Sequence, residues 1–92
     1  MKNLTVRLPQ NYEVGAVQCS DGAWGPMGRG SHDDVVVPIS CAPGATPTTV
    51  WHTHPDGIAE PSTADMDNAR SAGIRRVCVT VPATGETNCR NT

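Results

Sequence analysis

The shortage of large side chains limits what this chain can fold into. Its 92 residues include two tryptophans, one tyrosine and no phenylalanine, together with nine glycines and eight prolines. Folding has to offset roughly 1.5 kcal/mol of conformational entropy per residue, and a chain this short buries only about two thirds of its surface. We therefore expect a single thin-cored domain over residues 1–92 that gains stability from a metal ion, disulfides, a partner chain or a parent assembly.

The charge balance of the chain argues against two classes of partner. Seven Lys and Arg residues stand against nine Asp and Glu residues, which gives a formal net charge of −2. A chain without a basic surplus is poorly suited to nucleic acid or anionic lipid. No apolar run approaches the roughly 20 residues of a membrane span, and no basic start leads into an apolar signal-peptide core. The sequence thus predicts no nucleic-acid partner, no membrane partner and a cytoplasmic location.

The four cysteines leave two interpretations open. An even number in a short chain suits two disulfides in an oxidising compartment, and no CxxC pair for a zinc ribbon or a thioredoxin-like site occurs. Cys19 and Cys78 each lie inside a valine-rich run, where cysteine is also common as a small buried apolar residue. The sequence does not decide whether Cys19, Cys41, Cys78 and Cys89 are paired.

The predicted order of elements is strands, one helix, and strands again. Apolar alternation and short apolar runs predict strands over residues 4–8, 13–19, 35–39, 48–52, 74–81 and 86–89. Ser62 suits the N-cap of a helix, Asp65 suits its third position, and Gly73 suits a left-handed end. We expect a compact α/β domain with a mixed, largely antiparallel sheet and one main helix.

The segment from His52 to Asp65 combines residue types that bind metal. His52 and His54 are two positions apart at the end of a strand, so both imidazoles leave from the same face. Two neutral imidazoles form half of a transition-metal site. Asp65, on the same face of the helix start as Ser62, can supply a third ligand and leave a fourth position for water, as catalytic zinc requires. Ser62 and Asp65 also fit a capping box, and the two interpretations are compatible.

Glu13 is the best-placed base for that water. It begins a strand that we expect to lie near the His52 strand, and Gly15 has no side chain to keep another group away. A carboxylate in this place can accept a proton and later pass it to the leaving amine. Ser62 can donate a hydrogen bond to the oxyanion of the intermediate. The simpler alternative for Glu13 is an exposed carboxylate at a strand start.

These residues resemble the signature of the JAMM (MPN+) metalloprotease family: H-x-H, seven residues, S-x-x-D, with an upstream glutamate at the start of a strand. The resemblance implies a cytidine-deaminase-like α/β core in which His52, His54 and Asp65 bind Zn²⁺. It also implies that Glu13 is general base and acid and that Ser62 stabilises the oxyanion. The reaction would be hydrolysis of a peptide or isopeptide bond in a protein substrate, either ubiquitin-like or a sulfur-carrier protein.

The resemblance covers residues 13–81 and leaves two alternatives open. The long helix that the family usually has before its glutamate is missing, and the chain has no length for the insertions that grip ubiquitin. We therefore expect specificity to come from elsewhere, such as a homo-oligomer or a parent assembly. The alternatives are a non-catalytic MPN-type interaction module, which would not need intact ligands, and a toxin or phage-assembly domain whose specificity lies in a partner.

Two further polar segments have simpler interpretations. His32, Asp33 and Asp34 lack a further ligand at usable spacing, so we interpret them as a polar loop rather than a second metal site. The glycine-rich stretch before them lacks the GK[ST] of a P-loop. We interpret it as an ordinary surface loop, the alternative being a groove wall in which Trp24 and Arg29 contact substrate.

Overall fold

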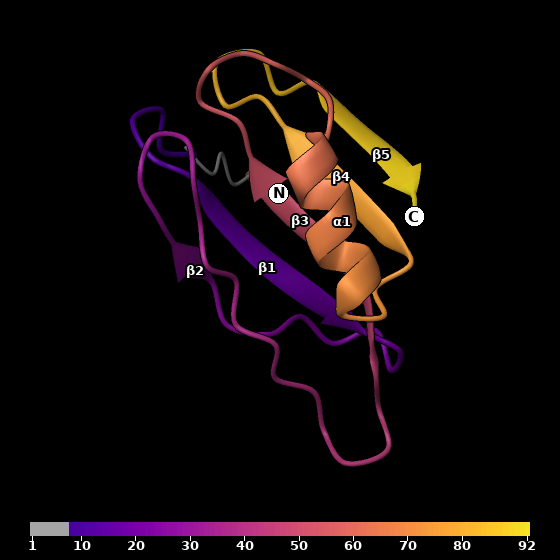
Figure 1. The fold of residues 1–92 in the computed structure, drawn as a ribbon. Helices are drawn as coiled ribbons and strands as arrows, with labels where there is room; N and C mark the ends of the chain where they lie inside the picture. The colour runs from indigo at the N-terminus through magenta and orange to yellow at the C-terminus, as the bar shows by residue number, and fades with distance from the viewer. Residues whose placement is uncertain (1–7) are drawn as a thin grey trace, which may run out of the picture.

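Residues 8–92, which the computed structural model describes, form a mixed five-stranded sheet with one helix packed against it (Figure 1). The elements in chain order are β1 (Val14–Cys19), β2 (Gly28–Arg29), β3 (Pro47–Thr53), α1 (Thr63–Ser71), β4 (Arg76–Thr80) and β5 (Thr87–Asn91). The strand order across the sheet is β2-β1-β3-β4-β5. Among these strands only β3 and β4 are parallel, joined by the crossover through α1, and the other neighbours are antiparallel. The predicted α/β class and the largely antiparallel sheet are confirmed.

Helix α1 begins at the predicted capping box and ends at the predicted glycine. The Oγ of Ser62 accepts a hydrogen bond from the N–H of Asp65 at 3.1 Å, and Oδ2 of Asp65 accepts one from the N–H of Ser62 at 2.8 Å. Gly73 follows the helix with a φ of +75°, a left-handed conformation that glycine adopts without steric cost. Because both ends are set by local contacts, the position of Asp65 in the first turn is fixed.

The core lies between α1 and the face of the sheet that it covers. Its centre is a cluster of small aliphatic side chains, with further partly buried residues around it: Val17, Ala69, Ile74 and Val77, then Val37, Val50 and Met66. Trp24 is 53% exposed, whereas Trp51 is half-buried and donates a hydrogen bond from Nε1 to Oγ1 of Thr80 at 2.9 Å. The core of the described residues is therefore as thin in aromatic side chains as the composition predicts.

Two disulfides supplement this core. Cys19, at the end of β1, is bonded to Cys41, and Cys78 in β4 is bonded to Cys89, its directly paired residue in β5. A disulfide typically stabilises a small domain by about 2–4 kcal/mol, mainly by restricting the unfolded chain. The pairing that the sequence leaves open is thus resolved, and part of the expected additional stabilisation is covalent.

The remaining strand predictions have mixed outcomes. The strands predicted over residues 13–19, 48–52, 74–81 and 86–89 correspond to β1, β3, β4 and β5, with ends shifted by at most two residues. The strand predicted over residues 4–8 lies outside the described residues apart from Leu8. Within residues 8–92, no helix has the length and apolar character that crossing a bilayer requires.

The prediction of a strand over residues 35–39 is wrong. The segment forms no strand, because Pro38 has no backbone N–H to donate and the neighbouring β2 is only two residues long. It packs backbone against backbone on β2, since a Cβ added at Gly28 would collide with the carbonyl oxygen of Val36. The segment runs as a wall beside the sheet and, as described below, borders the candidate site.

Candidate metal centre

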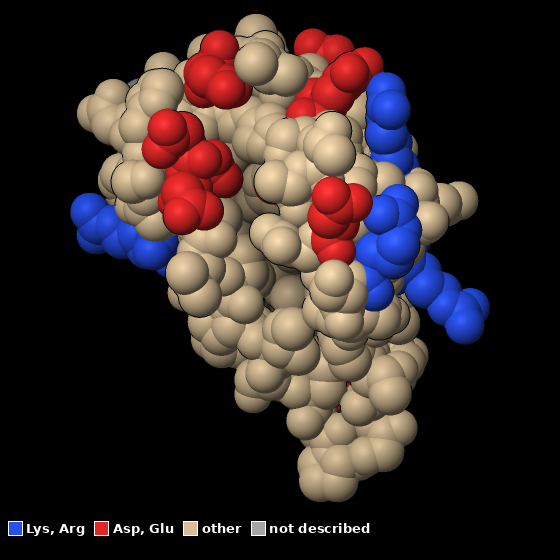
Figure 2. All heavy atoms as spheres, in the orientation of Figure 1, with Lys and Arg blue, Asp and Glu red and all other residues tan. Residues whose placement is uncertain are grey.

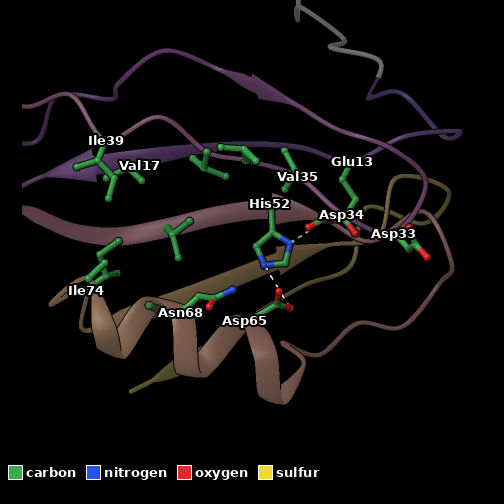
Figure 3. Close-up of a pocket in the computed structure, with 15 residues that line it drawn as sticks. Glu13, Val17, Asp33, Asp34, Val35, Ile39, His52, Asp65, Asn68 and Ile74 are labelled. Carbon is green, nitrogen blue, oxygen red and sulfur yellow. Dashed lines mark ion pairs between the residues drawn. The ribbon is translucent and has the colours of Figure 1, made fainter.

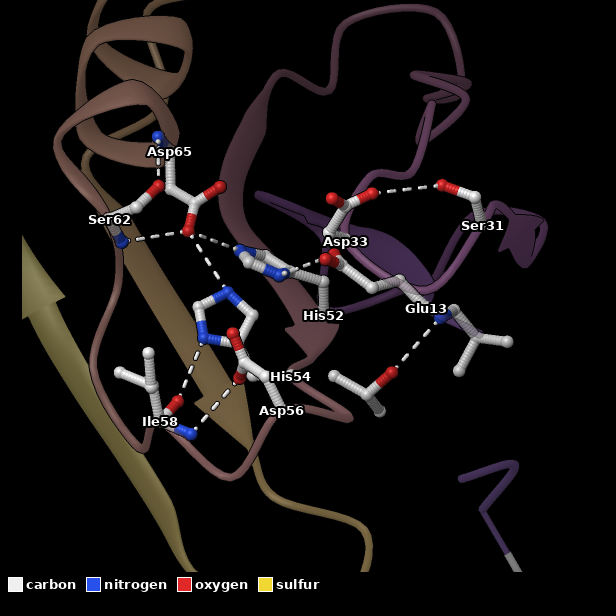
Figure 4. Close-up of polar contacts among 11 residues, drawn as sticks. Glu13, Ser31, Asp33, His52, His54, Asp56, Ile58, Ser62 and Asp65 are labelled. Carbon is white, nitrogen blue, oxygen red and sulfur yellow. Dashed lines mark hydrogen bonds and ion pairs between the residues drawn. The ribbon is translucent and has the colours of Figure 1, made fainter. Parts of the chain in front are cut away.

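The start of β1, the end of β3 and the first turn of α1 meet at one place (Figure 4). The antiparallel register sets Gly15 opposite His52, and Glu13, two residues before Gly15, faces the same side of the sheet. A Cβ added at Gly15 would lie 2.7 Å from the carbonyl oxygen of Trp51 and 3.0 Å from Cβ of His52. The predicted close approach at Gly15 is therefore confirmed, and it brings Glu13 to the histidines.

His52 is enclosed by two carboxylates. Its Nδ1 lies 3.4 Å from Oε1 of Glu13, and its Nε2 lies 3.4 Å from Oδ2 of Asp65. The residue is 3% exposed, and its buried Nδ1 has no hydrogen-bond partner among residues 8–92. Burial lowers the pKa of His52, which favours the neutral imidazole. A neutral imidazole can bind a metal ion, and Nε2, which faces Asp65, is the nitrogen on the side of His54.

His54 is held on both sides of its ring. Its Nδ1 lies 2.8 Å from the carbonyl oxygen of Ile58, and its Nε2 lies 3.2 Å from Oδ2 of Asp65. A carbonyl oxygen only accepts, so Nδ1 carries a proton and Nε2 is the nitrogen available to a metal. The hydrogen bond to Asp65 raises the pKa of His54, against the opposing effect of burial.

Asp65 and Glu13 are carboxylates with opposite pKa shifts. Burial acts to raise the pKa of Asp65, but hydrogen bonds from His54 and from the N–H of Ser62 outweigh it and lower the pKa to about 2. Burial raises the pKa of Glu13 to about 7, with repulsion from Asp65 adding to the effect and the charge of His54 opposing it. At neutral pH Asp65 is therefore ionised, whereas Glu13 can take up or release a proton.

The structure brings together every site residue that the sequence predicts. A buried group of Glu13, His52 and His54, whose ligand atoms all lie within 4.8 Å of one another, could hold a metal ion. One oxygen of Asp65 also lies beside Nε2 of both rings, so distance alone allows either carboxylate to complete a set of three ligands. Ser62 reaches the site through its two hydrogen bonds with Asp65.

A groove of about 360 Å³ opens beside these residues (Figure 3). One wall is the segment from Asp33 to Ile39, and the other is α1 with Ile74 behind it. In the face drawn in Figure 2, acidic side chains stand on either side of a hollow in the surface. The lining is acidic near His52 and aliphatic farther along, where Val17, Val37, Val50, Ala69 and Ala72 lie.

Two parts of this groove are missing from the sequence predictions. The segment predicted as a strand over 35–39 is a groove wall, and Asp33 and Asp34, predicted to be only a polar loop, stand at the mouth beside Glu13. The valine run itself indicates a partly buried segment, but its role as a wall depends on its placement across from α1, which no local pattern encodes. Arg29, the alternative groove contact, is not among the residues that line this groove. Its guanidinium carbon lies 4.2 Å from the centre of the Tyr12 ring.

Comparison with known proteins adds no relative: no family model, curated protein or solved structure matches this chain.

Proposed function

We propose that the protein is a zinc-dependent metallopeptidase of the JAMM (MPN+) type with a cytidine-deaminase-like core. The observation that carries the proposal is the convergence of His52 and His54 on one oxygen of Asp65, with Glu13 against the far side of His52. These four residues and Ser62 have the spacing of the family signature, and the fold places all of them at one end of the sheet.

The pKa values divide the two carboxylates between two roles. A metal ligand must remain deprotonated, which suits Asp65 with its pKa of about 2. A group that accepts and returns a proton works best with a pKa near the working pH, which suits Glu13 with its pKa of about 7. His52, His54 and Asp65 would therefore hold the zinc, which when bound supplies a Lewis acid for the scissile carbonyl and for water.

The chain's own residues then account for the proton transfers. Glu13 takes a proton from the attacking water and delivers it to the leaving amine. Ser62 accepts the N–H of Asp65 through a lone pair on Oγ, so its hydroxyl proton remains free to donate to the oxyanion. The buried position of Glu13, which is 6% exposed, keeps its proton from exchanging freely with bulk water.

The groove suits an extended peptide. Its aliphatic part accepts small apolar side chains, and its acidic end lies at the proposed reacting centre. Among the described residues, no backbone hydrogen bond involves residues 35–39. The N–H and C=O groups of this segment that do not face β2 are therefore available to pair with a substrate backbone, although Pro38 contributes no N–H. We infer that a substrate chain lies between this wall and α1 with its scissile carbonyl next to His52.

The disulfides bear on where such an enzyme works. Disulfides form and persist in oxidising compartments and are rare in the cytosol, and all four cysteines of this chain are paired. We therefore propose an oxidising compartment, which differs from the cytoplasmic location that the sequence predicts. Mass spectrometry after alkylation, with and without prior reduction, should show no free thiol in the native protein.

Metal analysis of the wild-type protein and the Glu13→Gln variant tests the proposed function. Both proteins, purified without added metal, should contain about one zinc per chain, and only the wild type should hydrolyse a mixed peptide library. Asp67→Asn, which neutralises an exposed carboxylate of α1 that pairs with Arg70, is the matched control and should retain full activity. Zinc without hydrolysis in the wild type would instead favour the interaction module, and absence of zinc would exclude both the site and the reaction.

A further inference from the structure

The loop between His54 and α1 rests on the edge strand β5. Nδ2 of Asn88 donates a hydrogen bond to the carbonyl oxygen of Ala59 at 2.6 Å. Two residues along the strand, the guanidinium of Arg90 forms an ion pair with Glu60 at 3.0 Å. Side chains two apart on a strand point to the same side, so Asn88 and Arg90 together hold consecutive residues of this loop.

The same loop determines the orientation of His54. The carbonyl of Ile58, one residue before Ala59, accepts the hydrogen bond from Nδ1 of His54 at 2.8 Å. Within the loop, the N–H of Ile58 donates to Asp56 at 3.0 Å and the N–H of Gly57 donates to the carbonyl of His54 at 3.2 Å. These contacts shape the turn, and they involve only residues of the turn itself.

Hydrophobic burial does little to hold this loop in place. Ile58, its largest apolar side chain, is 58% exposed, and Glu60 is also exposed. An exposed loop without an apolar anchor samples several conformations unless polar contacts hold it. The hydrogen bond from Asn88 is the shortest contact that joins the loop to another element, and its acceptor is one peptide unit from the carbonyl that binds His54.

Strand β5 is itself held by a covalent bond. All five of its residues are exposed, and among the described strands it pairs with β4 alone. Cys89, which lies between Asn88 and Arg90, is bonded to Cys78 of β4. The disulfide therefore fixes the strand at the point from which both loop contacts are made.

We propose that Asn88 is a positioning residue for the metal centre: with β5 fastened by Cys78–Cys89, it holds the loop carbonyl that keeps Nε2 of His54 directed at Asp65. The proposal rests on the metal centre proposed above but concerns β5, which lies beyond residues 13–81 that carry the family resemblance. It makes zinc affinity dependent on a disulfide that touches no ligand.

Two measurements on Asn88→Ala test the proposal. The zinc dissociation constant, from competition with a chromophoric chelator, should rise roughly threefold to tenfold, below the 10–100-fold typical for a direct partner of a ligand. The imidazole ¹⁵N shifts of His54 in metal-free protein, at a pH where the ring is neutral, should change from the Nδ1–H form to a mixture of tautomers. Asn91→Ala is the matched control, because Asn91 is an exposed residue of the same strand.

The outcomes separate this proposal from the proposed function. If the wild type binds no zinc, the metal centre fails, while the ¹⁵N shifts of His54 still test the positioning role. Unchanged shifts and affinity in Asn88→Ala, or equal effects in Asn91→Ala, would overturn it. The double variant Cys78→Ser, Cys89→Ser should also bind zinc more weakly than the wild type. If the double variant does not fold, Asn88→Ala still provides the test, because it keeps the disulfide.

Discussion

His52 and His54 lie two residues apart, yet the protein holds them in different ways. His52 is inside β3, paired with Gly15 on one side and Val79 on the other, and its Nδ1 has no hydrogen-bond partner in the part of the chain that the structure describes. His54 lies just past the end of β3, and its ring is fixed by the loop carbonyl of Ile58. The sheet thus positions one proposed ligand directly, whereas the other depends on a loop that rests on β5.

This difference also separates the electrostatics of the two rings. Burial lowers the pKa of His52, whereas the hydrogen bond to Asp65 raises the pKa of His54. The two rings therefore differ in how readily they bind a metal ion. His54 must first lose a proton that Asp65 stabilises, whereas burial favours the neutral form of His52. The comparison teaches that H-x-H spacing sets which face the rings occupy but not how readily each one binds.

Removing either ring should have the largest effect. His52→Ala and His54→Ala each leave two protein ligands, so zinc affinity should fall by at least about 10³-fold, because each site then loses a nitrogen ligand outright. The zinc-dependent rise in unfolding temperature of the wild type, which reflects binding to the folded state only, should disappear in both. Calorimetric titration and thermal melts measure the two effects. Retention of tight zinc binding in either variant would contradict the assignment of that ring.

Acid should weaken zinc binding in two steps. Above the pKa of His54 the affinity should be flat with pH. Below that pKa, a proton competes with zinc for His54, and the zinc affinity should fall by up to about tenfold per pH unit. A steeper fall should begin only below the lower pKa of His52, where a second proton competes. Competition titrations between pH 8 and about 5 give the slopes. A flat profile over this range would rule out histidine ligands, and a first step that persists in His54→Gln would assign the proton to another group.

The metal-free protein should lose stability as pH rises, because of Glu13. The pKa of this carboxyl is raised from 4.5 to about 7 in the folded state, so the folded state binds more protons than the unfolded state between these values. Its ionisation should therefore destabilise the fold by about 3 kcal/mol as the pH rises through this range. Urea denaturation at pH 5 and pH 8 measures the change. Glu13→Gln should remove it, and an unchanged pH dependence in that variant would contradict the burial of the charge.

The smallest effect is expected from narrowing the groove. Ala72→Leu enlarges a residue on the groove wall, so kcat/KM for peptides with aliphatic side chains should fall severalfold while zinc affinity stays unchanged. Ala64→Leu adds the same atoms to an exposed position of α1 outside the groove lining. Peptide hydrolysis by the two variants gives the comparison, and equal losses in both would show that the groove does not bind substrate.

The parts of the site that the sequence predicts are those fixed by local geometry. His52 and His54 follow from strand alternation, and Asp65 follows from the capping box of Ser62. Glu13 needs one further element, the register that sets Gly15 opposite His52. In each case the spacing along the chain determines the direction in which the side chain points. A single sequence is therefore sufficient to predict that these residues lie together.

The parts that the sequence does not predict depend on contacts between distant segments. Residues 35–39 have the composition of a strand, but Pro38 and the short β2 beside them leave the segment as a groove wall. The pairing of Cys78 with Cys89 follows from the β4–β5 register, and the role of Asn88 follows from a loop 29 positions away. No periodicity carries this information, because it is created only when the sheet assembles.

A zinc-edge anomalous diffraction map of crystals grown with zinc tests the central claim most directly. The proposed roles predict a single peak about 2.0–2.2 Å from Nε2 of His52, Nε2 of His54 and a carboxylate oxygen of Asp65, with Glu13 outside ligand distance. Absence of a peak at this place would contradict the metal centre. A peak coordinated by Glu13, with Asp65 engaged only in its cap on Ser62, would contradict the division of the two carboxylates into ligand and base.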